Sequence, residues 1–146
     1  MRIATIQMVS AATVAANLER AGALLAQAAD GGAELAVLPE YFCLLGRRDT
    51  DKVEVREPDG DGPIQRFLAQ TAARHGIWLL GGTIPIACGS PGKVRNVSPL
   101  YAPDGTRAAR YDKIHLFGLD RGAERFDESN TIEAGRTPVV ADVDGF

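Results

Sequence analysis

Two stretches of the sequence set an ionisable side chain against apolar neighbours. Lys113 interrupts the run RYDKIHLF, and Glu40 directly follows the apolar run AELAVLP. Because desolvating an ammonium costs several kcal/mol, a lysine on an inner strand surface needs an acidic partner. Carboxylates around one ammonium can differ in pKa, and a fixed positive charge can stabilise a forming oxyanion. Position alone leaves two plainer interpretations open, a solvated loop glutamate and an edge-strand lysine whose ammonium reaches water.

Three further side chains have both a chemical and a structural interpretation. Glu128, in FDESN, is by itself typical of a helix or turn cap. His75 ends a predicted helix, where a histidine is ordinary, and we interpret it as structural. We expect His115 to be an inner histidine with satisfied hydrogen bonds rather than a ligand. No spacing of His, Cys, Asp and Glu resembles a metal site. The glycine-rich stretches GDG at 60–62 and GG at 81–82 fall short of a phosphate-binding loop.

The two cysteines are weak candidates for a nucleophile. Cys43 follows Glu40 by three residues, and on a pleated strand that offset places the two side chains on opposite faces. A small buried cysteine is more often a core residue than a nucleophile. Cys88 lies in ACGSPG, a predicted exposed loop. The two cysteines form neither a metal spacing nor a disulfide framework.

The elements that must position Glu40 and Lys113 follow from the spacing of apolar residues. Helical spacing occurs in two segments, and short continuous apolar runs indicate buried strands in three others. Thr13 is the predicted N-cap of the first helix, and Pro39 must end the second strand. The helices are predicted within residues 13–32 and 64–76, and the strands within residues 2–8, 33–42, 77–86 and 137–146, with two more within residues 94–117 joined by a turn at 103–105 and with loops at 46–63 and after Leu119.

This order of elements predicts an α/β fold in which the first three strands are parallel and buried on both faces. In such sheets, functional residues collect just beyond the carboxyl ends of the strands. Glu40 occupies such a position, and Lys113 lies on a later strand. We therefore expect the two side chains to face each other across one end of the sheet.

The bulk composition limits the class of protein. The chain has 146 residues, 45% of them hydrophobic and 24% charged, which is typical of one globular domain. A net charge of −3 and the lack of a basic run argue against a nucleic-acid partner. No apolar run reaches membrane-spanning length, and the first residues are too polar for a signal peptide. We therefore expect a soluble cytoplasmic domain.

Four motifs, in their order and at their separations, resemble the nitrilase superfamily of carbon–nitrogen hydrolases: LAVLPEYF, WLLGGTIP, DGTRAARYDKIHLF and FDESNTIEAG. They are most similar to the branch of amidases that act on deaminated glutathione and on ω-amides of 2-oxo acids. The resemblance covers nearly the whole chain. It implies the N-terminal half of a four-layer α-β-β-α sandwich, a small carboxylate-bearing amide as substrate, no cofactor or metal, and a homo-oligomer when the protein is full length.

The resemblance also implies a role for each candidate residue. Glu40 corresponds to the general base, Lys113 to the lysine that steadies the oxyanion, and Glu128 to a second glutamate that positions substrate and lysine. The family's nucleophile is a cysteine in a later G-x-x-x-C-Y-D segment, which this sequence does not reach. We therefore expect residues 1–146 to be a truncated hydrolase domain, inactive alone because its Glu-Lys-Cys site lacks the cysteine. The alternative is a non-catalytic small-molecule-binding or regulatory module of the same fold.

Overall fold

Three short parallel strands form one half of the main sheet. The computed structural model describes residues 1–122 and 124–146. Ile3 pairs with Leu35, and Leu35 pairs with Trp78, so the predicted parallel arrangement is confirmed. These strands are β1 (Ile3–Thr5), β2 (Leu35–Val37) and β3 (Trp78–Leu80).

Antiparallel strands complete the sheet. They are β4 (Ile84–Ala87), β5 (Val94–Tyr101) and β6 (Arg107–Asp112). The sheet order is β1-β2-β3-β5-β4, with β6 paired to β5. The predicted hairpin is confirmed, because β5 and β6 pair antiparallel on either side of the turn at 103–105. The strand predicted over residues 77–86 is interrupted after Leu80. Both of its parts, β3 and β4, pair with the same edge of β5, opposite β6, and the register shifts by one residue between them.

A close backbone approach explains the break between β3 and β4. Gly82 has a φ of 54°, in the left-handed region that favours glycine. A Cβ atom at this position would lie 2.1 Å from the carbonyl oxygen of Pro39. The GG pair therefore lets the chain pass directly against the end of β2, where Glu40 follows.

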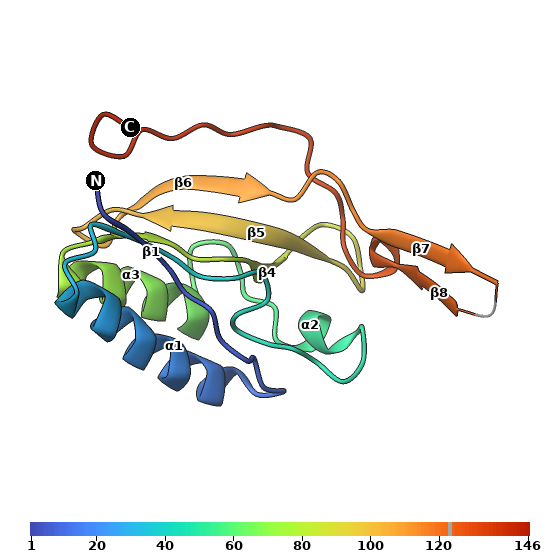
Figure 1. Cartoon of the computed structure of the whole chain (residues 1–146). Helices are drawn as coiled ribbons and strands as arrows, with labels where there is room; N and C mark the ends of the chain where they lie inside the picture. The colour runs from blue at the N-terminus through green and yellow to red at the C-terminus, as the bar shows by residue number, and fades with distance from the viewer. Residues whose placement is uncertain (123) are drawn as a thin grey trace.

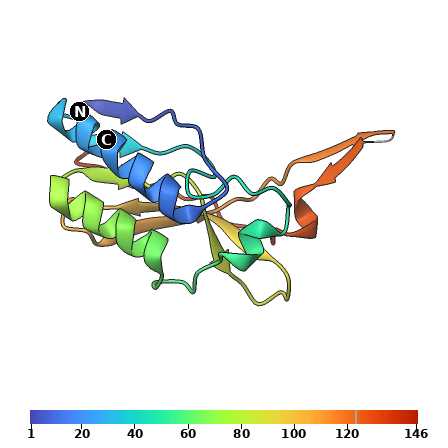
Figure 2. The ribbon, with the colours of Figure 1, turned by 90° about the horizontal axis from the view of Figure 1, so that it is seen from below.

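Two long helices lie side by side on one face of the sheet (Figure 1, Figure 2). The first, α1 (Val14–Asp30), has Thr13 at its N-cap as predicted. The second, α3 (Pro63–His75), begins with a proline and ends at Gly76, whose left-handed conformation stops it as predicted. A short helix, α2 (Asp51–Glu54), lies inside the segment predicted as a loop. None of the helices in the described part of the chain is long and apolar enough to cross a membrane.

The core fills the space between these helices and the sheet. Side chains alternate along each strand, so Ala36 and Leu79 face the helices and are fully buried. Their neighbours Leu35 and Trp78 point to the opposite face and are only partly buried, and Ile3 is 53% exposed. The prediction that the first strands are buried on both faces is therefore wrong for these 146 residues, because the helices cover one face only.

The C-terminal segment crosses this open face instead of adding a strand (Figure 1). The indole Nε1 of Trp78 donates to Asp144 at 2.9 Å, which fixes the end of the segment over β3. Val143 and Phe146 exchange backbone hydrogen bonds with each other in a turn. The prediction of a strand at 137–146 is therefore wrong. Its apolar residues favour a strand, yet no strand of the described chain pairs with it, and Val140 is 97% exposed.

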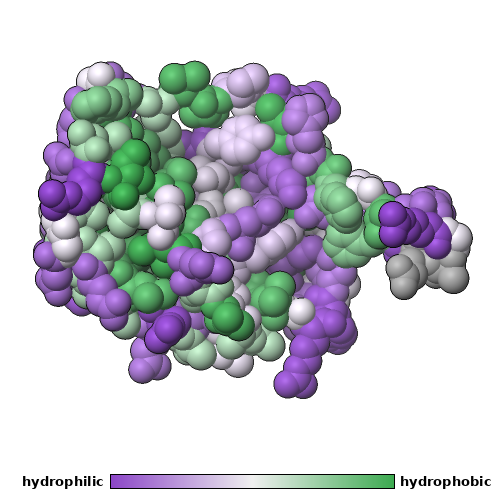
Figure 3. Space-filling model, viewed as in Figure 1, coloured by the Kyte–Doolittle hydropathy of each residue, from purple (hydrophilic) through white to green (hydrophobic). Residues whose placement is uncertain are grey.

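A second, two-stranded sheet projects from the body of the molecule. It consists of β7 (Gly118–Arg121) and β8 (Glu124–Asp127), where the sequence predicts a loop after Leu119. Figure 3 shows the hairpin standing away from the body with hydrophilic residues at its outer end. The prediction failed because this segment has little apolar alternation. Leu119 and Phe126 pair across its strands, and the ring of Phe126 lies 6.0 Å from that of Phe117.

Candidate active site

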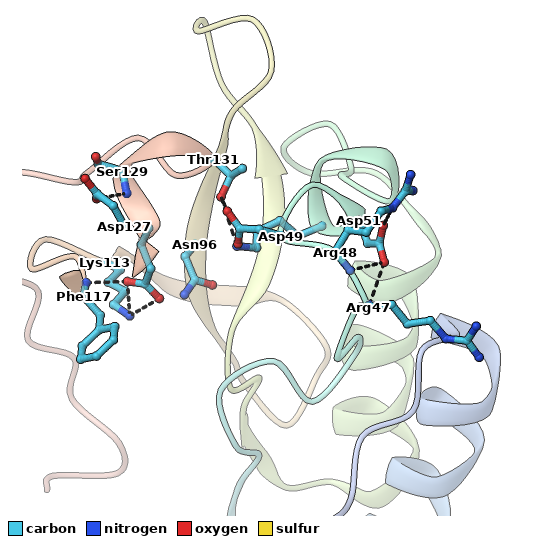
Figure 4. Close-up of polar contacts among 12 residues, drawn as sticks. Arg47, Arg48, Asp49, Asp51, Asn96, Lys113, Phe117, Asp127, Ser129 and Thr131 are labelled. Carbon is cyan, nitrogen blue, oxygen red and sulfur yellow. Dashed lines mark hydrogen bonds and ion pairs between the residues drawn. The ribbon is translucent and has the colours of Figure 1, made fainter. Parts of the chain in front are cut away.

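The structure brings the three predicted site residues into direct contact. Glu40 lies in the turn after β2, Lys113 directly follows β6, and Glu128 begins the 3-10 helix η1 (Glu128–Asn130). The Nζ atom of Lys113 lies 3.1 Å from Oε1 of Glu40 and 2.9 Å from Oε2 of Glu128. Figure 4 shows the polar contacts around Lys113. The two carboxylates therefore flank one ammonium, while the catalytic roles assigned to them remain predictions.

The backbone of Lys113 is held from both sides. Its N–H donates to the carbonyl oxygen of Asn96 on β5 at 2.9 Å, and its carbonyl oxygen accepts from the N–H of Gly135 at 2.8 Å. A Cβ atom on Gly135 would lie 2.2 Å from the carbonyl oxygen of Asp112, so glycine lets this segment approach closely. The strand itself ends at Asp112, so the prediction that Lys113 lies on a strand that extends toward Phe117 is wrong. The backbone of Lys113 therefore continues the direction of β6 and is held by hydrogen bonds, although it lies outside the regular strand pairing.

The environment of Lys113 favours its charged form. Burial disfavours the ammonium, but its hydrogen bonds to Glu128 and Glu40 outweigh burial and hold the pKa of Lys113 above its usual value. The side chain is partly buried, with 21% of it exposed. This site therefore carries a fixed positive charge at neutral pH.

Glu128 is fixed more firmly than a turn cap would be. Its residue is 5% exposed, and its Oε2 atom accepts from the N–H of Phe117 at 2.7 Å. Its own N–H donates to the carbonyl oxygen of Phe117 at 3.0 Å. The cap of η1 is instead Asp127, whose carboxylate accepts from the N–H of Ser129. The carboxylate of Glu128 is thereby free of the capping role and directed to Lys113.

The turn that carries Glu40 is positioned by contacts the sequence does not reveal. Tyr41 has a φ of 55°, unusual for a non-glycine residue, and its N–H donates to Oγ1 of Thr83 at 3.0 Å. The Nδ2 atom of Asn96 donates to Oε1 of Glu40 at 2.9 Å. Asn96 was missed by sequence reasoning. Its signal was an amide inside an apolar strand, since a buried amide requires a hydrogen-bond partner.

The structure supports excluding Cys43 as a nucleophile, although for a different reason. Residues 40–43 form a turn, so the prediction that Cys43 and Glu40 alternate on a strand is wrong. Cys43 is fully buried, and this burial raises the pKa of its thiol to about 12. Cys88 is partly exposed and lies beyond β4. Neither thiol is in contact with Lys113 among the described contacts.

The two histidines lie away from these contacts. His75 is the last residue of α3, as the structural interpretation requires. His115 is exposed, so the prediction of an inner histidine is wrong for these 146 residues. The chain turns away from the sheet after Lys113, which carries His115 outward.

A cavity of about 300 Å³ lies beside Glu128 and Tyr41. Leu44, Leu45 and Phe126 give it an apolar part. Two of its basic side chains are paired within the protein, Lys52 with Asp49 and Arg48 with Asp51 and Glu54. The guanidinium of Arg47, which also lines the cavity, has no partner among the described contacts. The cavity has the size and the mixed lining expected for a small ligand that has both apolar and polar groups.

The fold and this cluster are those of a carbon–nitrogen hydrolase. The family model of the carbon–nitrogen hydrolases matches residues 2–145, and the chain belongs to that family. Within the family, the chain is 37% identical to the omega-amidase NIT2 of Danio rerio over 137 residues, covering 93% of this chain and 48% of the relative. It is 36% identical to a deaminated glutathione amidase of Synechocystis over 146 residues, covering 98% of this chain and 53% of the relative.

Solved structures agree with this assignment. The structure of Saccharomyces cerevisiae Nit3, a member of the nitrilase superfamily, matches with a TM-score of 0.81 at 28% identity, covering 97% of this chain and 51% of that protein. The CN-hydrolase superfamily protein XC1258 of Xanthomonas campestris matches with a TM-score of 0.80 at 29% identity, covering 99% of this chain and 50% of that protein. The chain thus spans about half the length of its relatives and has the N-terminal half of their fold.

Proposed function

We propose that this chain supplies the Glu-Lys-Glu part of an amidase site that cleaves small carboxylate-bearing amides. The observation that carries the proposal is the ammonium of Lys113 held between Glu40 and Glu128 at the carboxyl end of the sheet. Among relatives, the names omega-amidase and deaminated glutathione amidase support the choice of substrate class. A cavity lined by apolar and polar side chains lies beside Glu128, where part of such a substrate could bind.

In the proposed mechanism the nucleophile is a cysteine thiol that follows these 146 residues in the full-length protein. Glu40 accepts the thiol proton as sulfur bonds to the amide carbon, and the carbonyl electron pair moves to oxygen. Lys113 stabilises the resulting oxyanion. The intermediate collapses as Glu40 returns the proton to the leaving nitrogen, and water, deprotonated by Glu40, then hydrolyses the thioester to the carboxylic acid and free thiol. Glu128 holds Lys113 in place throughout.

Residues 1–146 would then form the N-terminal part of a hydrolase domain whose second part carries the nucleophile. Neither cysteine of this chain fits the role, because burial keeps Cys43 as a thiol and Cys88 lies apart from the cluster. We also propose, from the sequence and the family, a cytoplasmic homo-oligomer for the full-length protein.

The test is ammonia release from 2-oxoglutaramate by the full-length protein. Wild-type protein should turn over this ω-amide, while Glu40→Gln and Lys113→Met should each lower kcat/KM by at least about 1,000-fold. The matched control is Glu19→Gln, an exposed glutamate on α1, which should retain full activity. Residues 1–146 alone should release no ammonia.

Two outcomes would overturn the proposal. Turnover by residues 1–146 that is lost in Cys43→Ala would make Cys43 the nucleophile. A full-length protein that binds the ω-amide without hydrolysing it would instead identify a non-catalytic binding module of the same fold.

A further inference from the structure

Asn96 joins the two sides of the candidate site from a single position on β5. Its side-chain Nδ2 donates to Oε1 of Glu40 at 2.9 Å, and its backbone carbonyl oxygen accepts from the N–H of Lys113 at 2.9 Å. The residue is only 3% exposed, and it lies on a strand paired with β3, β4 and β6. Figure 4 shows its side chain on the strand beside Lys113. One rigid residue is thus bonded to both partners of the ion pair.

The identity of the contacting atom follows from chemistry. An ionised carboxylate only accepts hydrogen bonds, so the amide must turn its NH2 group, and not its oxygen, toward Glu40. The same Oε1 atom also receives the ammonium of Lys113 at 3.1 Å. Among the described residues, Oε2 of Glu40 receives no hydrogen bond. The two carboxylate oxygens are therefore inequivalent.

We propose that Asn96 is a positioning residue that anchors Oε1 of Glu40, so that Oε2 is the atom that takes the proton from the attacking thiol. This inference rests on the proposed amidase function. In the proton transfer, the S–H bond breaks and an O–H bond forms on Oε2, and that same proton later leaves with the amine nitrogen. Oε1 keeps its two donors throughout, which holds the carboxylate plane still while Oε2 changes its protonation state.

A comparison with the chain's other buried asparagine separates this role from ordinary packing. Asn17 is 1% exposed, and its amide bonds only backbone groups, those of Ala11 and Cys43. Asn96 instead directs its amide to an ionisable side chain that is itself exposed. Water alone would solvate this carboxylate without fixing it, whereas the bond to Asn96 holds it in one orientation, as a general base requires.

The experiment uses the full-length protein with Asn96→Ala and Asn96→Asp, followed by kcat, KM and the pH dependence of kcat/KM for an ω-amide. For Asn96→Ala we expect kcat to fall about 100-fold with KM changed less than about threefold, because the base is misplaced while binding is kept. Asn96→Asp places a second carboxylate against Glu40. It should lower kcat further and move the acid limb of the profile to higher pH.

The control is Asn17→Ala, which removes a buried amide of the same kind. It should lower the melting temperature at least as much as Asn96→Ala, with the acid limb unmoved and kcat lowered less than about threefold. If Asn17→Ala lowers kcat as much as Asn96→Ala, or if Asn96→Asp leaves the acid limb in place, Asn96 has only a structural role and the inference is wrong.

A crystal structure of full-length Asn96→Ala tests the positioning without any activity. We expect the carboxylate of Glu40 to rotate or to occupy more than one orientation while Lys113 keeps its contact with Glu128. A Glu40 carboxylate that stays in place would overturn the inference, even if the wild-type protein is an active amidase. Conversely, absence of amidase activity in the wild-type protein would reject the proposed function and with it the proton-accepting role of Oε2, while the crystal structure would still decide whether Asn96 positions Glu40.

Discussion

At the scale of single residues, the ion pairs of Lys113 lead us to expect an effect on stability apart from its proposed catalytic role. Its ammonium compensates the carboxylate of Glu128, whose side chain is only 7% exposed. Lys113→Met leaves that carboxylate without its cation. Breaking a buried pair costs roughly 3–5 kcal/mol, and the partial exposure of Lys113 lowers our expectation to about 2 kcal/mol. Urea unfolding of the full-length protein measures this loss.

The double variant Lys113→Met/Glu128→Gln is the matching control. Removing both charges abolishes the unpaired carboxylate, so the double variant should be more stable than Lys113→Met alone. If the double variant is no more stable than Lys113→Met, or if its loss equals the sum of the losses of the two single variants, Glu128 is well solvated and the pair is not coupled.

The thiol of Cys43 gives a second prediction at this scale. Burial raises its pKa to about 12, so the reactive thiolate is scarce near pH 8 and the side chain is also shielded. Alkylation of the full-length protein with iodoacetamide at pH 8, mapped by mass spectrometry, should modify the partly exposed Cys88 and leave Cys43 unmodified. In urea both should react. Rapid alkylation of native Cys43 would contradict the burial described for it.

At the scale of elements, the start of α3 depends on a residue that lies before it. Glu57 is 4% exposed, and its carboxylate accepts from the N–H groups of Ile64 and Gln65 at 2.5 Å and 3.1 Å. It therefore caps the helix although Gly62 holds the N-cap position. We expect Glu57→Ala to destabilise the protein by about 2 kcal/mol, since it leaves buried donors unpaired. The control is Asp61→Ala, at an exposed neighbouring residue, which should cost less than about 0.5 kcal/mol. Thermal unfolding of both variants measures the difference.

How far the sequence predicts these elements depends on where their partners lie. The two long helices, α1 and α3, and the hairpin of β5 and β6 carry their own signals, namely helical spacing, Gly76 and an Asp-Gly turn, and they were predicted. The break at Gly82 depends on the carbonyl of Pro39, more than forty residues earlier, and no local pattern records it. Glu40 and Lys113 were found through motifs. Asn96 was missed because its partner is set by the pairing of β5, which only the folded sheet defines.

At the scale of the whole molecule, the sheet has one covered face and one open face. The helices bury the first face, and the C-terminal segment crosses the second, held to Trp78 through Asp144. Ile3 and Val140 stay 53% and 97% exposed, so this segment covers the face incompletely. We expect another layer to cover this face, because a contiguous exposed apolar patch is unusual on a monomer.

The last prediction is that residues 1–146 expressed alone do not form a stable monomer. At roughly 25 cal/mol per Å², every 400 Å² or so of apolar area left uncovered forgoes about 10 kcal/mol, which is comparable to the whole stability of a domain. The isolated chain should therefore self-associate or bind the dye ANS, and it should unfold without a sharp transition, whereas the full-length protein should unfold cooperatively. Size-exclusion chromatography with light scattering, ANS fluorescence and calorimetry measure the three properties. A cooperative monomer without ANS binding would mean that the C-terminal segment covers the open face well enough by itself, and it would favour a binding module complete within these residues.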